Sequence, residues 1–143
     1  MTRTAAREIA VQIAFAAADK DFALTAEDIL ANTDAFAQDC ELYADDIDPK
    51  HRKYILDVVS ALDSHLEEID GVIQKYSKTR LIGRISRTAL ACMRVALCEM
   101  LYMEDIPVGA TINSIVEIDK GYDDDETVRF VNGVLGSVAR EFK

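Results

Sequence analysis

The side chains best suited to bind another molecule lie near the carboxyl end of the sequence. Phe130 has Arg129 beside it, with Thr127 before and Asn132 after it. Recognition of a single-stranded nucleic acid requires a stacking surface, a partner for phosphate and a group that reads base edges. These four residues are candidates for that chemistry, and the backbone amides at the start of a helix would add an anion-binding element. The alternative is structural, with Phe130 packed in a core and Gly133 allowing close helix approach.

Basic residues are concentrated in one segment, although the chain as a whole is acidic. The 143 residues carry 16 Lys and Arg against 26 Asp and Glu, a formal net charge of −10. Such a charge argues against coating a nucleic acid or an anionic membrane. Residues 73–94 nevertheless hold six basic side chains, Arg84 among them, and no acidic one. This segment is either a solvated connector paired with neighbouring acids or a phosphate-contacting patch, so any RNA binding should be local and salt-sensitive.

The other reactive residue types form no recognisable catalytic or metal site. The cysteines are Cys40, Cys92 and Cys98, without a Cys-x-x-Cys pair, and the histidines are His51 and His65. We find no nucleophile elbow, glycine-rich phosphate loop or paired-carboxylate motif, so we expect no enzyme, no cofactor and no metal. No secretory signal is visible, and no apolar run approaches the roughly 18 residues that cross a bilayer. The odd number of cysteines favours a cytoplasmic protein without disulfides.

The spacing of apolar residues predicts the helices that must position these side chains. Gly71 is expected to end the longest of them, which leaves Val72, Ile73 and Tyr76 on a short separate piece. The helix that follows Gly83 is apolar on most sides, as is typical of the centre of a bundle. No alternating strand pattern occurs, and we therefore predict one all-α domain over residues 1–143, with about seven helices. The expected helices cover residues 4–18, a short stretch after residue 25, residues 54–69, 85–102 and 110–120, and the chain after residue 127.

Four strings, taken in order, resemble the NusB family. They are MRVALCEM at residues 93–100, IP at 106–107, INSIVEI at 112–118 and RFVNGVL at 129–135, and residues 6–12 look like the family's first helix. The resemblance implies a compact helical bundle in two subdomains and a transcription antitermination factor. Such a factor binds boxA-type single-stranded RNA of ribosomal RNA operon leaders together with NusE, a small-subunit ribosomal protein. It acts within the antitermination complex of RNA polymerase.

The resemblance also suggests which residues bind which partner. Arg3 and Arg7 match the basic first helix that the family uses for RNA, and Gln12 shares part of a face with Arg7. Phe15 matches an aromatic position that faces NusE, and Ala89 stands where several relatives carry an acidic residue at that contact. The residues expected to bind RNA are Arg3, Arg7, Gln12, Arg84, Thr127, Arg129, Phe130 and Asn132.

Arg94 and Glu117 are expected to form a structural ion pair. Each lies within an apolar helical stretch, and burying one charge alone would cost several kcal/mol. A pair between their two helices would avoid that cost, with Glu99 as the competing partner of Arg94.

Two alternatives to an RNA-binding antitermination factor remain. A protein-binding scaffold of the same fold with a weakened RNA site fits the sparse basic residues of the first helix and the acids before Thr127. The helical front end of RNA cytosine methyltransferases shares this bundle, but the sequence contains no S-adenosylmethionine motif. Some relatives dimerise, so we expect a monomer or a homodimer when no partner is bound.

Overall fold

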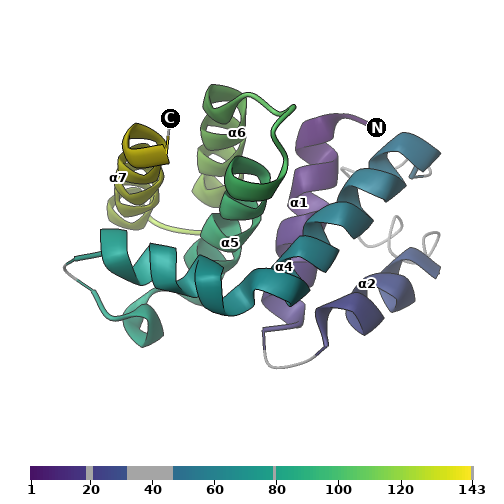
Figure 1. Ribbon diagram of the computed structural model, residues 1–143, viewed down its shortest axis with the longest axis horizontal. Coiled ribbons are helices and arrows are strands. Elements are labelled where there is room, and N and C mark those ends of the chain that lie inside the picture. Colours follow the sequence, from purple (N-terminus) through teal and green to yellow (C-terminus); the bar gives the residue numbers. More distant parts are fainter. Residues whose placement is uncertain (19–20, 32–46, 79, 143) are drawn as a thin grey trace.

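The described part of the chain consists of six α-helices and one short 3-10 helix (Figure 1). This computed structural model describes residues 1–18, 21–31, 47–78 and 80–142, except the side chains of residues 23–24 and 29–31. No strand occurs in these ranges, so the predicted all-α class is confirmed. Within the same ranges no helix is long and apolar enough to cross a membrane. The elements are α1 (Arg3–Ala16), α2 (Phe22–Ala31), α4 (Pro49–Tyr76), η2 (Ile82–Arg84), α5 (Arg87–Tyr102), α6 (Val108–Lys120) and α7 (Asp125–Phe142).

Helix α5 occupies the centre of the bundle. It contacts α1, α4, α6 and α7, and all of its residues 91–100 are buried. A helix that is apolar on most sides can be accommodated only where neighbours cover it all round. The other helices are arranged about it, with α2 packed on α1 and α4 toward one end of the long axis and α7 at the opposite end (Figure 1).

Helix α4 is one long kinked helix, and the prediction that Gly71 ends it is wrong. The helix continues through Gly71 to Tyr76, and only His65 departs from helical dihedrals, with φ −123° and ψ 22°. A glycine inside a helix costs about 1 kcal/mol, which the burial of Ile69 and Ile73 on either side of it offsets. The kinked residue, His65, stacks on a tyrosine of α5 with ring centroids 4.1 Å apart.

Candidate nucleic-acid interface

The side chain of Gln74 in α4 binds the backbone of the connector between α4 and α5. Gln74 Nε2 donates to the carbonyl of Arg80 at 3.1 Å, and Gln74 Oε1 accepts from the N–H of Ile82 at 2.9 Å. The N–H of Arg80 also donates to the carbonyl of Ser77 at 2.8 Å. Because these hydrogen bonds hold the backbone at residues 80 and 82, the Arg80 side chain starts from a defined position.

Arg80 links this connector to the start of α7. Its guanidinium carbon lies 4.6 Å from the centroid of the half-buried Phe130 ring, and its Nη2 lies 3.5 Å from Glu126 Oε1. Asp124 Oδ1 accepts from the N–H of Thr127 at 2.8 Å and so caps α7. That hydrogen bond to the backbone holds the pKa of Asp124 below its usual value. The sequence indicated Phe130 but not its cation, because Arg80 reaches it only when the connector folds against α7.

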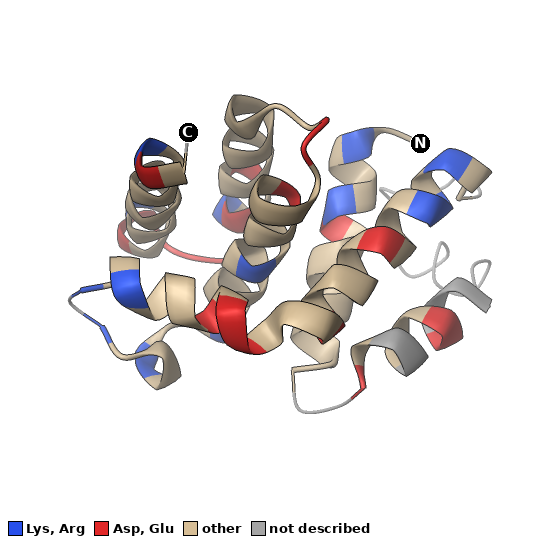
Figure 2. Cartoon of the chain, in the orientation of Figure 1, with Lys and Arg blue, Asp and Glu red and all other residues tan. Residues whose placement is uncertain are grey.

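The structure brings most of the predicted RNA-binding residues to one end of the molecule. Arg129 and Asn132 are exposed near the start of α7, and Thr127 and Phe130 are half-buried beside them. Arg84 is exposed at the end of η2. Figure 2 shows the basic residues of the connector at the same end of the long axis as α7. This end of the molecule therefore combines exposed cations with an aromatic ring.

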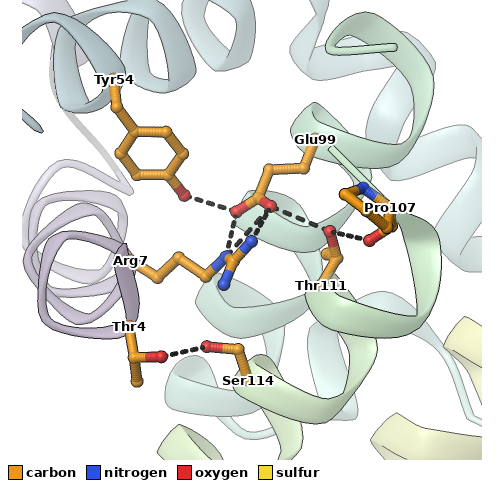
Figure 3. A network of polar contacts seen from close by, with 7 residues as sticks. All are labelled: Thr4, Arg7, Tyr54, Glu99, Pro107, Thr111 and Ser114. Carbon is orange, nitrogen blue, oxygen red and sulfur yellow. Dashed lines mark hydrogen bonds and ion pairs between the residues drawn. The ribbon is translucent and has the colours of Figure 1, made fainter. Parts of the chain in front are cut away.

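Arg7 is buried in an ion pair with Glu99 of α5 (Figure 3). Arg7 Nε lies 2.8 Å from Glu99 Oε2 and Arg7 Nη2 lies 2.8 Å from Oε1. Tyr54 of α4 donates to the same carboxylate, as does Thr111 of α6 at 2.9 Å. Burial alone lowers the pKa of Arg7, but the hydrogen bonds and charge of Glu99 raise it above its ordinary value. The prediction that Arg7 contacts RNA is wrong, because its side chain is only 5% exposed and bound to Glu99.

Arg3 lies apart from the cluster at α7. Its guanidinium carbon is 4.4 Å from the centroid of the Tyr54 ring, beside a cavity of about 560 Å³ that Lys50 and His51 also line. In Figure 1 the start of α1 lies well away from α7 along the long axis. The structure therefore does not bring Arg3 together with Phe130, and a contact between Arg3 and RNA stays a prediction.

Arg94 pairs with Asp70 of α4, so the predicted pair with Glu117 is wrong. Arg94 Nε and Nη2 lie 2.9 and 2.8 Å from the two carboxylate oxygens of Asp70. Glu117 is exposed on α6 and pairs with Lys120 at 2.8 Å. The competing partner, Glu99, is bound to Arg7. Asp70 was missed because it lies where the helix was expected to end, and so was assigned to no helix face.

A second surface surrounds Phe15 near the end of α1. Phe15 is 40% exposed and Tyr122 is 48% exposed, and the guanidinium carbon of Arg87 lies 4.9 Å from the centroid of the Phe15 ring. The Tyr122 hydroxyl donates to Glu8 at 2.9 Å and accepts from Gln12 Nε2 at 3.3 Å. Gln12, predicted to bind RNA, thus lies on this surface rather than beside Phe130. A pocket of about 170 Å³ is lined by Val11, Gln12, Phe15, Thr88 and Tyr122.

Ala89 is fully buried, which excludes the predicted contact of its side chain with a partner. Its N–H donates to Ser86 Oγ at 3.0 Å, the hydrogen bond that caps α5. The first turn of α5 therefore faces the interior at Ala89.

A buried carboxyl group lies at the end of α6. Asp119 is fully buried, and this burial, together with the nearby carboxylate of Asp123, raises its pKa to about 8. Cys92 Sγ lies 3.9 Å from Asp119 Oδ1, and Ser86 Oγ lies 3.0 Å from Asp123 Oδ1. Burial also raises the pKa of the Cys92 thiol. No local pattern in the sequence indicates this cluster, because its members come from separate elements.

The described residues contain no group of three or more His, Cys, Asp or Glu side chains that could hold a metal ion. Cys92 and Cys98 are buried thiols without a disulfide, and Cys40 lies outside the described residues. Burial raises the pKa of Cys98 to about 12. Both described thiols therefore stay protonated at neutral pH, as expected of small core residues.

Comparison with known proteins gives matches along nearly the whole chain. The model of the NusB family matches residues 4–140. The transcription antitermination protein NusB of Acetivibrio thermocellus is 40% identical over 141 residues, which cover 98% of this chain and 90% of that protein. The protein of the same name from Alkaliphilus oremlandii is 34% identical, with 99% and 95% covered. The solved structure of T. maritima NusB has a TM-score of 0.82 and 27% identity, and the match covers 99% of this chain and 92% of that one.

Proposed function

Because this chain belongs to the NusB family, whose members named above are transcription antitermination proteins, we propose that it binds boxA-type single-stranded RNA of ribosomal RNA operon leaders together with NusE. The observation that carries the proposal is the Phe130 ring under the Arg80 guanidinium, at the end of the molecule where the basic connector lies. Aromatic rings and guanidinium planes both stack on unpaired bases, and neighbouring cations neutralise phosphates. In this role the protein acts within the antitermination complex of RNA polymerase.

The acidic residues near Phe130 are compatible with this site. The Glu126 carboxylate pairs with Arg80, and the Asp124 carboxylate caps α7. Both carboxylates therefore have partners within the protein, which reduces their repulsion of a phosphate. The overall charge of −10 still opposes RNA elsewhere on the surface, so binding should be local, salt-sensitive and strengthened by a partner.

The surface around Phe15 is the proposed contact with NusE. Phe15 and Tyr122 are large exposed aromatic side chains with a pocket between them, and aromatic side chains in such positions commonly anchor protein interfaces. Arg87 adds a cation at the edge of the Phe15 ring. An apolar centre with a charged rim suits a protein partner better than a nucleic acid.

The test is a fluorescence anisotropy titration of a labelled boxA-type RNA, with and without NusE and at several salt concentrations. We expect binding that is tighter than for a scrambled oligonucleotide, weakens as salt rises and strengthens when NusE is present. If neither condition gave binding above the scrambled control, the RNA function would be rejected.

A protein-binding scaffold is the second candidate, and the burial of Arg7 favours it. The ion pair with Glu99 removes one of the two arginines of α1 from the surface, which weakens any RNA contact at this helix. Under this alternative, NusE binds with undiminished affinity after Arg3→Glu, and no boxA-type RNA binds in either condition. The RNA titrations with and without NusE distinguish the two functions.

A further inference from the structure

A groove beside Phe130 has no assigned occupant. It lies between the carboxyl end of α4 and the face of α7, and has a volume of about 480 Å³. That volume is within the range of roughly 300–1,000 Å³ typical of small-ligand sites. A Cβ atom built at Gly133 would meet nothing within 4 Å, so the groove is open directly against the backbone of α7. Its walls include Tyr76, Lys78, Phe130, Gly133, Ser137 and Arg140.

The chemistry of these walls suits a planar group joined to an anion. Tyr76 and Phe130 contribute aromatic rings, and the buried Tyr76 hydroxyl has no hydrogen-bond partner among the described residues. Arg140 Nη2 donates to Ser137 Oγ at 3.1 Å, which lays the arginine along α7. A ligand in this groove would thus meet aromatic surface, the Ser137 hydroxyl and cations.

Charged residues are distributed unevenly along the groove. Lys78 is exposed at the end next to the basic connector, whereas Glu141 accompanies Arg140 at the other end. A phosphate is therefore favoured near Lys78, because Glu141 offsets the charge of the neighbouring Arg140. Phe130 lines the groove, and the Arg80 guanidinium lies over the Phe130 ring. The groove is therefore continuous with the candidate RNA surface.

We propose that this groove binds one nucleotide of the single-stranded RNA, with its phosphate near Lys78 and its base in the space beside Gly133. The inference rests on the proposed function and extends the path of the RNA from Phe130 along α7. Single-stranded RNA is recognised through bases that leave the stack and enter pockets of this kind. The nucleotide here is read by stacking and by the Ser137 hydroxyl rather than by charge alone.

The test fills the groove and compares the result with a matched substitution elsewhere. Gly133→Leu places a side chain in the groove, and Gly71→Leu is the control, since a Cβ at Gly71 in α4 also meets nothing within 4 Å and does not line the groove. We expect Gly133→Leu to weaken binding of the boxA-type RNA about tenfold, the loss typical of one stacked base. Gly71→Leu should bind as the wild type does.

A second measurement uses the unmodified protein, so the outcome does not depend on how the variant folds. On addition of the RNA, the backbone amide signals of Gly133 and Ser137 should shift in ¹⁵N-resolved NMR spectra, and that of Gly71 should not. The proposal that the groove binds a nucleotide would be overturned if a folded Gly133→Leu kept its RNA affinity while Phe130→Ala bound more weakly. That result would leave the proposed function intact. Unshifted Gly133 and Ser137 signals with bound RNA would also overturn it. Failure of the wild type to bind RNA above the scrambled control rejects the proposed function itself.

Discussion

The carboxylate of Glu99 in α5 is held by the guanidinium of Arg7 in α1, through contacts of 2.8 Å from each of two nitrogens. Hydroxyl groups of Tyr54 and Thr111 bind the same carboxylate. Helices α1, α4, α5 and α6 thus meet at a single buried charge, which is fully enclosed. A buried charge is tolerated only with such complete pairing, so the docking of these helices and the pairing of Arg7 depend on each other.

Glu99→Gln should destabilise the fold by about 3–5 kcal/mol, because it leaves the Arg7 guanidinium buried without a counter-charge. The free energy of unfolding from urea denaturation measures this. Glu117→Gln is the control, since Glu117 is exposed and pairs only with Lys120 at the surface. That control should change stability by no more than about 0.5 kcal/mol. Equal losses for the two variants would contradict the central position of Glu99.

Arg84→Ala should reduce both the affinity for RNA and its dependence on salt. One phosphate contact fewer lowers the slope of log affinity against log salt by about 0.7 for a single strand. Phe130→Ala should weaken binding with little change of slope, because it removes stacking rather than charge. Lys53→Ala is the control, an exposed lysine of α4 that pairs with Asp57. An unaltered slope for Arg84→Ala would place the RNA elsewhere.

Phe15→Asp should weaken the complex with NusE at least about tenfold, since it places a charge where an aromatic anchor is expected to be buried. Leu56→Asp is a matched control, because Leu56 is 39% exposed and Phe15 is 40% exposed. Isothermal titration calorimetry with NusE measures both, and RNA binding without NusE should be the same for both variants. Similar losses of NusE affinity would show that the Phe15 surface is not a specific contact.

Asp119 should make the protein less stable as pH rises through neutrality. Its pKa is about 8 in the folded protein, against the ordinary value of 3.8 for an aspartate. Between these values the folded state keeps a proton that the unfolded state has lost, so stability falls from about pH 4 to about pH 8 and then levels off. Asp119→Asn removes this dependence and should stabilise the protein at about pH 8.5 by about 1–3 kcal/mol.

The difference in melting temperature between Asp119→Asn and the wild type, followed with pH, isolates this one group from the other titrating residues. The exposed Asp125→Asn serves as its control. A constant difference across the pH range would mean that Asp119 is ionised throughout.

Much of the fold could be predicted from local pattern. The apolar residues of α5 on most of its sides correctly indicated a central helix, and the strings at residues 93–100 and 129–135 correctly indicated the NusB family. The prediction that Gly71 ends the helix was wrong, because a glycine in a helix costs less free energy than the burial of Ile69 and Ile73 contributes.

The sequence by itself determined the helical class, the family and the stretch of α7 where the RNA-binding candidates lie. Only the tertiary structure decided which partner each arginine has: Arg7 is buried against Glu99 and Arg94 against Asp70, whereas the partly exposed Arg80 lies on the Phe130 ring. The physical reason is that helical periodicity reports which face of a helix is covered, whereas the partner of a side chain depends on how helices dock. Arg7 and Glu99 are 92 residues apart in the sequence, so no local sequence pattern can show that they pair.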